Sequence, residues 1–293
     1  MYDDDYENKS KTGCIEPCTK YKQYNKMLAS LYAKALNINP ILMSPARLAS
    51  IKECGEILIY READKETRKL TQANFCRDRL CPMCNWRKSL KLHQQIRAIV
   101  ELVETWQPTR YLFVTLTIHN VNGQELGDAI DNLNKGFKRL IDDSKNHAKS
   151  KRFRKYLLGY MRSIEITYNR RTDTYHPHIH AIIAVRPAYF GRGYLTKIDW
   201  AKMWGDAMNL DYVPSIDVRA IFPAEQKKAV AEIAKYPVKS TDVLEIDDEE
   251  QAIETIITLR KAMHGRRLVT YGKQFREAAR KLKLKDIEQV NLN

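Results

Sequence analysis

The sequence predicts an α+β fold: a central antiparallel sheet with flanking helices, a small cysteine-rich element and helical additions at both ends. Residues 162–169 and 175–185 alternate polar and apolar side chains on either side of a short polar turn, which is the pattern of a β-hairpin. Residues 111–118 alternate in the same way, whereas residues 128–141 repeat apolar side chains at helical spacing.

Two more segments complete the predicted sheet domain. Apolar spacing indicates a helix at 199–208, and alternation indicates a strand at 214–222. With a further helix at 224–238, the order is strand, helix, two strands in a hairpin, helix, strand and helix. This order suits an antiparallel sheet with helices on one side and the strand 175–185 at its centre.

The composition is that of a globular protein with a polyanionic partner. The 293 residues include 50 Lys and Arg against 36 Asp and Glu, for a net charge of +14. Such an excess favours nucleic acid as a partner. We find no run of eighteen apolar residues and no signal peptide, so we expect a cytoplasmic protein without a membrane partner.

Residues 1–52 form an N-terminal helical extension in this prediction. Apolar positions recur at helical spacing in residues 20–36, and residues 43–51 predict a second, short helix after Pro40. Neither segment carries residues with obvious chemistry, so both are expected to serve as scaffold or partner contacts.

Residues 53–105 predict a zinc-ribbon-like element followed by a basic helix. Strand-like segments at 57–61 and 69–75 lie between one cysteine and a group of three more. A sheet this short needs a metal to hold its ends together, because it cannot bury a core. The expected ligands of a structural Zn²⁺ are Cys54, Cys76, Cys81 and Cys84.

Other assignments of these thiols stay open. Cys14 and Cys18 compete with Cys54 for the fourth position, and His93 is a further candidate. The cysteines could also be free thiols buried in a core. A redox dithiol at Cys81 and Cys84 is disfavoured, because no thioredoxin-like strand pattern surrounds the pair.

A basic helix is expected at 86–99, directly after the cysteines. Its cations Arg87, Lys88 and Lys91 are expected to point outward, either toward a nucleic-acid backbone or simply into solvent.

The hairpin carries a candidate metal site. Successive side chains of a strand point to opposite faces, so His178 and His180 share one face, and His176 has the same parity. Pairing across a turn near Thr172 brings Glu165 opposite one of the two histidines. Two imidazoles and a carboxylate suit an exchangeable divalent ion, Mn²⁺ or Mg²⁺; the alternative is that the histidines only face solvent.

These motifs resemble those of HUH endonucleases, specifically the single-tyrosine rolling-circle replication initiators of small Gram-positive plasmids. The stretch HPHIHAIIAV resembles the family's His-hydrophobe-His motif, and FVTLTIHNV its first motif. CRDRLCPMCNWRKS resembles its cysteine-rich segment, and EIAKYPVKS its tyrosine motif. The resemblance runs from about Cys54 to Lys239. It implies an RRM- or ferredoxin-like HUH palm over residues 106–242, with the threonine side of 111–118 next to the metal.

The resemblance also implies a nucleophile, Tyr236. Glu232 lies four residues earlier, hence on the same helical face, and Lys239 follows three residues later. In such a family Tyr236 attacks a phosphodiester to give a 5′-phosphotyrosine and a free 3′-hydroxyl. Glu232 then acts as a base or activates water in termination, and Lys239 contacts phosphate or lowers the tyrosine pKa. An ordinary surface glutamate is the alternative for Glu232.

The C-terminal residues 243–293 are expected to form a basic helical segment that contacts origin duplex or caps the palm. An acidic run at 247–250 starts one helix, and the basic residues 266–285 are compatible with another. We see no nucleotide-binding glycine loop, so unwinding and synthesis require a host helicase and DNA polymerase. The expected partner is origin DNA, as single-stranded nick site and flanking duplex; the oligomeric state stays open, with a dimer as one option.

Three other functions compete with the initiator. A single-tyrosine transposase or relaxase shares the histidine pair and the tyrosine. A non-catalytic, zinc-containing DNA-binding protein would leave His178 and His180 facing solvent. A cupin-like oxygenase would need a glutamate a few residues after the pair, and residues 181–185 contain none.

Overall fold

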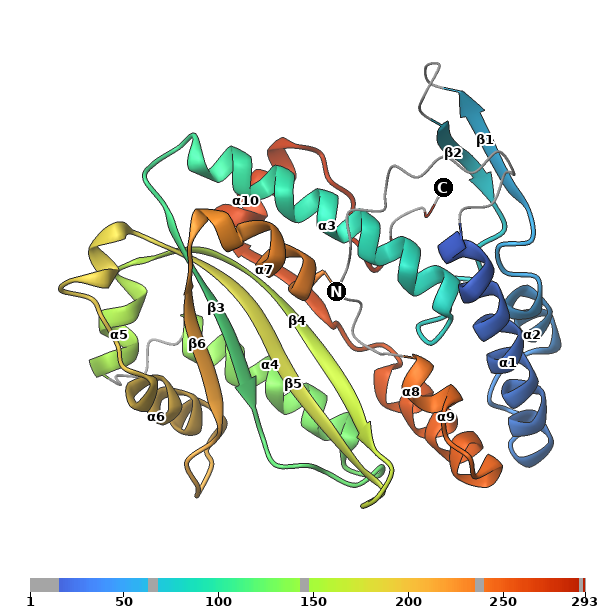
Figure 1. Ribbon diagram of the computed structural model, residues 1–293. Helices are drawn as coiled ribbons and strands as arrows, with labels where there is room; N and C mark the ends of the chain where they lie inside the picture. The colour runs from blue at the N-terminus through green and yellow to red at the C-terminus, as the bar shows by residue number, and fades with distance from the viewer. Residues whose placement is uncertain (1–15, 63–67, 143–147, 235–239, 290–291, 293) are drawn as a thin grey trace.

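A computed structural model describes residues 16–62, 68–142, 148–234, 240–289 and 292 of the chain (Figure 1). Its centre is a five-stranded sheet in the order β6-β3-β5-β4-β7, and every neighbouring pair is antiparallel. The α+β prediction is confirmed, including the central place of the histidine strand. The strands are β3 (Arg110–Thr117), β4 (Leu157–Asn169), β5 (Thr174–Val185), β6 (Ile216–Ile221) and β7 (Val269–Lys273).

The β4–β5 hairpin has the predicted register. Glu165 pairs with His178, and Ser163 pairs with His180. Asp173 turns the chain with a φ of 48°, in the left-handed region that Asp adopts more readily than most residues. This register places Glu165 and the two histidines on one face of the sheet, as expected from strand alternation.

The apolar second half of β5 is buried on both faces of the sheet. Ile179, Ala181 and Ile183 are fully buried on one face, and Ile182 and Ala184 are buried on the other. A strand that is covered on both sides reads as a continuous apolar run rather than an alternating one. This explains why the alternation of the histidine strand stops after His180.

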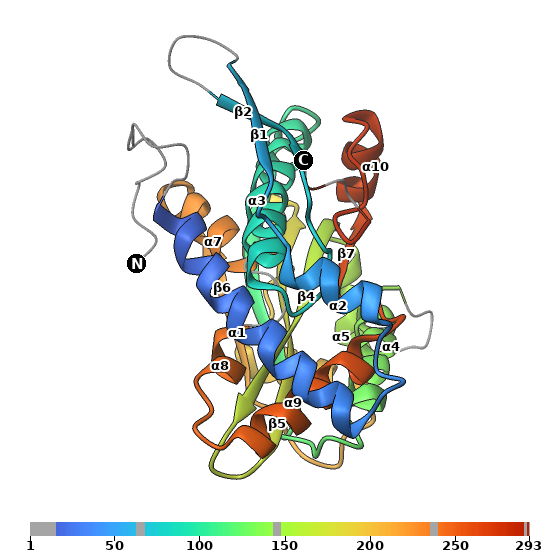
Figure 2. The same ribbon diagram turned by 90° about the vertical axis from the view of Figure 1, so that its right-hand side faces the viewer.

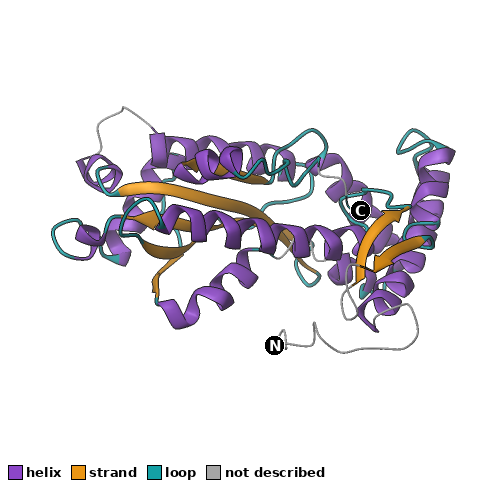
Figure 3. Cartoon of the chain, turned by 90° about the horizontal axis from the view of Figure 1, so that it is seen from above, coloured by secondary structure: helices purple, strands orange, loops and turns teal. Residues whose placement is uncertain are grey.

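Helices cover both faces of the sheet, so the expectation of helices on one side is wrong (Figure 3). On one face α4 (Leu126–Asp142) packs the Phe137 ring edge-on against Tyr160, and α6 (Lys197–Met208) donates from Trp204 to the Thr117 carbonyl. On the histidine face, Tyr271 of β7 donates to Gln95 of α3 (Pro82–Glu104). The helices α7 (Gln226–Ile233) and α10 (Gln274–Lys281) also pack there, against β5 and β4.

The N-terminal and cysteine-rich elements form as predicted. They are α1 (Glu16–Ile38), α2 (Pro45–Lys52), β1 (Leu58–Glu62) and β2 (Arg68–Ala73). Ser44 caps α2 by accepting from the Arg47 amide, and Pro45 occupies the first helical position, where a missing N–H costs nothing. Figure 2 shows the β1–β2 hairpin extending beyond α1 and α3.

The basic helix α3 does not present its cations as expected. Lys88 is 3% exposed, and Arg87 is half-buried and donates from Nε to the Leu292 carbonyl at 2.9 Å. Because α3 lies between α1 and α10, its polar side meets the protein rather than solvent. The prediction of an outward cationic face is therefore wrong for these two residues.

The C-terminal part contains a strand where the sequence predicted only helix. The helix α9 (Glu249–Met263) starts at Asp248, whose side chain accepts from two backbone amides, as the acidic run predicts. The residues from 269 to 273 instead form β7, which pairs with β4 at the sheet edge. Shorter helices are α5 (Ala148–Arg154) and α8 (Ser240–Leu244). Within the described ranges, no helix is long and apolar enough to cross a membrane.

Candidate metal centre

Three side chains converge on the face of the sheet that carries the histidines. Glu165 Oε2 lies 3.1 Å from His180 Nε2 and 3.8 Å from His178 Nε2. The two Nε2 atoms are 3.1 Å apart. All three ligand atoms lie within 4.8 Å of one another, so β4 and β5 bring together the three residues that the sequence predicted as a metal site.

The other nitrogen of each imidazole is already engaged. His178 Nδ1 lies 3.0 Å from the carbonyl oxygen of His176, which can only accept, so Nδ1 carries the proton and Nε2 presents a lone pair. His180 Nδ1 lies 3.1 Å from the hydroxyl of Thr115, the residue of β3 that pairs with His180. When His180 Nδ1 donates to this hydroxyl, the Nε2 lone pairs of both rings face each other, and a cation between them would satisfy both.

Burial keeps His178 neutral. The side chain is largely enclosed, and this desolvation lowers the pKa of His178 to about 4; the His176 carbonyl and Glu165 oppose the shift, while the neighbouring imidazoles add to it. A metal ligand must be the neutral imidazole, so the environment prepares His178 for coordination at neutral pH.

The spacing of the donors fits a small divalent ion. Neighbouring ligands of an octahedral ion with bonds of about 2.1 Å are about 3.0 Å apart. The two 3.1 Å separations at His180 match that value. Two imidazoles and one carboxylate leave further coordination positions for water or a substrate oxygen, as in other sites with two histidines and one carboxylate.

His176 lies beside this group rather than in it. Its ring stacks 5.1 Å from that of His178, and its Nδ1 contacts Asn120 Oδ1 at 3.0 Å. Asn120 also donates to Thr174, which ties the loop after β3 to the hairpin. The sequence analysis missed Asn120, because a single polar residue in a loop carries no pattern; only pairing of Val121 with Tyr175 brings it there.

The predicted nucleophile cannot be placed. Tyr236 and Lys239 lie outside the described residues. Glu232 is described: it is a half-buried residue in the last turn of α7, a helix that packs against β5. The structure therefore places the helix that leads to Tyr236 on the strand that carries both histidines.

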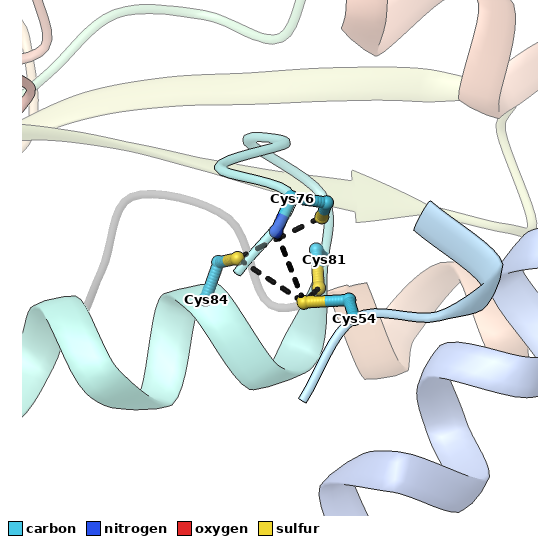
Figure 4. A group of neighbouring side chains, drawn as sticks. All are labelled: Cys54, Cys76, Cys81 and Cys84. Atoms are coloured by element: carbon cyan, nitrogen blue, oxygen red, sulfur yellow. Dashed lines mark hydrogen bonds between the residues drawn. The ribbon is translucent and has the colours of Figure 1, made fainter. Parts of the chain in front are cut away.

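A second group of ligand atoms is formed by the four predicted cysteines (Figure 4). Cys54 Sγ lies 3.6 Å from Cys84 Sγ and 3.5 Å from Cys81 Sγ, and Cys76 Sγ lies 3.7 Å from Cys84 Sγ. Sulfur ligands of a tetrahedral Zn²⁺ with bonds of about 2.3 Å are about 3.8 Å apart. The cluster is thus close to the size that zinc requires.

Backbone amides point at these sulfur atoms. The amides of Cys76 and Arg77 lie 3.3 Å from Cys54 Sγ and 3.1 Å from Cys84 Sγ. Arg77 reaches its position with a φ of 60°. Such N–H donors suit deprotonated thiolates as acceptors. Burial and the neighbouring thiols, however, raise the pKa of Cys81 well above its usual value and so favour its protonated form. A cation that replaces the thiol protons would resolve this conflict, which supports zinc over free thiols.

Of the alternative ligands, only His93 has a described side chain, and it is not part of the cluster. Cys14 lies outside the described residues, and the position of the Cys18 side chain is likewise not described. His93 is half-buried on α3 and does not belong to the group of four sulfur atoms.

A buried aspartate connects the cysteine cluster to three helices. Asp78, which follows Cys76 by two residues, is 3% exposed. Its Oδ2 lies 2.5 Å from Arg260 of α9 and 3.5 Å from Arg47 of α2, and its Oδ1 accepts from the Tyr32 hydroxyl of α1 at 3.0 Å. The sequence analysis missed this residue, because its partners lie up to 182 positions away in the chain.

Known proteins resemble this chain over most of its length. A family model described as replication protein matches residues 67–293. A protein named Protein rep from Bacillus amyloliquefaciens is 37% identical over 262 residues, which cover 83% of this chain and 75% of that protein. Protein rep from Lactiplantibacillus plantarum is 34% identical over 297 residues, which cover 98% and 88%. No solved structure matches. The chain therefore belongs to the replication protein (Rep) family of initiators, as the resemblance of its motifs predicts.

Proposed function

We propose that the chain starts plasmid rolling-circle replication by nicking and rejoining one DNA strand at the double-strand origin. The convergence of Glu165, His178 and His180 carries this proposal, because two imidazoles and a carboxylate could hold a divalent ion that also binds a phosphate oxygen of the DNA strand. Membership of the Rep family supports a role in replication, and the net charge of +14 suits a DNA partner.

Glu165, His178 and His180 would hold Mn²⁺ or Mg²⁺ in this function. When bound there, such an ion would polarise the scissile phosphate as a Lewis acid and would compensate the charge that develops on its oxygens. The protein residues set the geometry: Thr115 and the His176 carbonyl contact the Nδ1 atoms and orient the rings, and burial keeps His178 neutral.

Tyr236 is the proposed nucleophile. Its phenol oxygen attacks phosphorus, the bond from phosphorus to the 3′-oxygen breaks, and the leaving oxygen takes a proton to become a 3′-hydroxyl primer. The 5′-phosphotyrosine keeps the bond energy for a later transesterification. In the proposed scheme Glu232 accepts the phenol proton or activates water in termination, and Lys239 contacts phosphate. Host helicase and polymerase act on the nicked strand.

The cysteine cluster is proposed as a structural Zn²⁺ site. All four thiols are buried, so no coordination position is open to a substrate, as in other closed zinc sites. Zinc would hold the β1–β2 hairpin, the start of α3 and the loop of Asp78 together.

Covalent capture tests the proposed activity. The protein is incubated with labelled single-stranded oligonucleotides that carry plasmid origin sequences, with Mn²⁺ or with EDTA. We expect a metal-dependent covalent adduct in wild type and in the control Tyr24→Phe, and none in Tyr236→Phe. Cleavage without an adduct would indicate a hydrolytic nuclease, and binding without cleavage on every origin would favour a non-catalytic DNA-binding protein.

A further inference from the structure

The end of the sheet opposite the metal centre gathers arginines and exposed aromatic rings. Arg110 begins β3 and pairs with Val185, whereas Thr117 ends β3 and pairs with His178. Seven residues at about 3.3 Å each separate these two ends by about 23 Å. In Figure 1 this end lies on the left, where β3 starts and the chain leaves β5. We call it the arginine–aromatic end; it consists of Arg110, Arg186, Phe190, Arg192, Tyr194 and Phe222.

Arg110 lies against two aromatic rings. Its guanidinium carbon is 4.6 Å from the Phe190 ring centre and 5.9 Å from that of Phe222. Phe222 is 56% exposed although it is a large apolar residue. Glu225 fixes its backbone, because its side chain accepts from the Phe222 amide in the short helix Pro223–Glu225. The Phe222 ring is therefore exposed to solvent, while a hydrogen bond holds the backbone that carries it.

The loop after β5 presents a second ring. The Arg152 guanidinium donates to the carbonyl oxygens of Arg192 and Tyr194 at 2.8 and 3.0 Å. Between them, Gly193 packs so closely that an added Cβ would lie 2.5 Å from the Tyr156 ring. These contacts hold the loop on the body of the protein, and yet Tyr194 remains 53% exposed.

Three arginines at this end form no ion pair among the described residues. Arg186 and Arg192 are exposed, and within the described part of the chain Arg110, Arg186 and Arg192 make no ion pair with an acidic side chain. Two acidic residues that are near this end in sequence accept from backbone amides instead. Glu225 accepts from Phe222, and Asp199 accepts from the Thr196 amide in a capping box.

We propose that the arginine–aromatic end binds single-stranded DNA, namely origin strand that continues beyond the nick site; this assignment rests on the function proposed above. Exposed rings stack on unpaired bases, and guanidinium groups contact phosphates, which is how proteins hold single strands without reading sequence. Duplex DNA would leave the rings unused, because its bases are stacked inside. A strand stacked at about 3.4 Å per nucleotide needs about seven nucleotides to span 23 Å.

Oligonucleotide length separates this site from the metal centre. Binding is measured by fluorescence anisotropy for an origin oligonucleotide with three nucleotides on each side of the nick, and for versions extended by fifteen nucleotides on the 5′ or the 3′ side. For the double variant Phe222→Ala, Tyr194→Ala we expect at least fivefold weaker binding of one extended strand. Binding and nicking of the short strand should stay unchanged.

Matched variants identify the interaction. Phe222→Tyr with Tyr194→Phe keeps both rings and should bind like wild type, as should Ile41→Ala, an exposed apolar control on the other side of the protein. Arg186→Gln with Arg192→Gln should lower the slope of log K against log salt for the extended strand by about 1.4, at about 0.7 per phosphate contact. Arg97→Gln, which removes an exposed cation of α3, should leave this salt slope unchanged.

The outcomes distinguish the two proposals. Equal affinity of wild type for short and extended strands, or unchanged binding in the double variant, would overturn the arginine–aromatic site even if nicking proceeds. A loss of duplex binding without a loss of single-strand binding would also overturn it, in favour of a duplex surface. If wild type does not nick but shows length-dependent binding that the double variant loses, the site stands and the proposed nickase activity falls.

Discussion

The Thr115 hydroxyl is expected to set the metal affinity of the histidine site. Its oxygen lies 3.1 Å from His180 Nδ1, the ring nitrogen that points away from Glu165. Thr115→Val keeps the shape of the side chain and removes the hydroxyl. His180 then loses the contact that holds its ring with Nε2 toward Glu165, although the Phe113 ring, 5.6 Å away, still limits its rotation.

The size of the effect follows from comparable hydrogen bonds to histidine ligands in other metal sites. Losing such a partner typically weakens metal binding 10–100-fold, which corresponds to about 1.4–2.8 kcal/mol. Because Phe113 retains part of the orientation, we expect the lower end of this range, about tenfold. His178 should be unaffected, since a backbone carbonyl of its own strand holds its ring.

Calorimetric titration of the zinc-loaded protein with Mn²⁺ measures this change. Thr117→Val is the matched control: it lies on the same face of β3, but its hydroxyl donates to the Ser215 carbonyl and not to a histidine. Thr115→Ser, which keeps a hydroxyl, should restore the affinity. An unchanged Mn²⁺ affinity in Thr115→Val, or an equal loss in Thr117→Val, would refute this account of the site.

Three further variants test the remaining assignments. In Cys84→Ser we expect less than one Zn²⁺ per chain by colorimetric release. Weaker zinc binding would cost several kcal/mol of folding free energy and lower Tm by about 10 °C, at about 2–4 °C per kcal/mol. In Asp78→Asn the guanidinium groups of Arg260 and Arg47 lose their carboxylate. A fully buried broken pair costs about 3–5 kcal/mol, and since Arg260 is 24% exposed we expect about 2 kcal/mol in urea unfolding. Glu232→Gln should leave the first nick intact and impair termination in a plasmid replication assay.

Each of these has an outcome that contradicts it. Full zinc content in Cys84→Ser would remove that residue from the ligand set. Asp217 is an exposed aspartate on β6, so Asp217→Asn should change the free energy of unfolding by less than about 0.5 kcal/mol. A loss in Asp217→Asn as large as that in Asp78→Asn would contradict the stabilising role of the buried Asp78 pairs. Normal termination in Glu232→Gln would leave that glutamate without the proposed role.

Local patterns in the sequence predicted most of the elements that position the metal site. Alternation in residues 162–169 and 175–185, with one short turn between them, predicts a hairpin and its register, so Glu165 could be matched to the histidines from the sequence alone. Clustered cysteines likewise predicted the four-sulfur group, because thiols that are close in sequence around a short hairpin have few ways to meet.

Contacts between distant segments were not predictable in this way. Lys88 looked solvent-exposed because its helix is basic, but α1 and α10 cover that side, and neither is near it in sequence. The residues from 269 to 273 looked helical within a basic stretch, yet an open edge of β4 offered backbone partners that only the assembled sheet provides. Asp78 owes its burial to helices that come from three separate parts of the chain.

The sequence alone predicted the strands other than β7, the faces of the hairpin β4–β5 and the Glu165, His178 and His180 group, because these depend on the period of side chains along one segment. Tertiary structure decided which helices cover each face, which charges are buried, and which arginines and rings meet at the far end of the sheet. These depend on the packing of segments up to 218 residues apart, such as Arg260 against Leu42, and no local periodicity encodes such a contact.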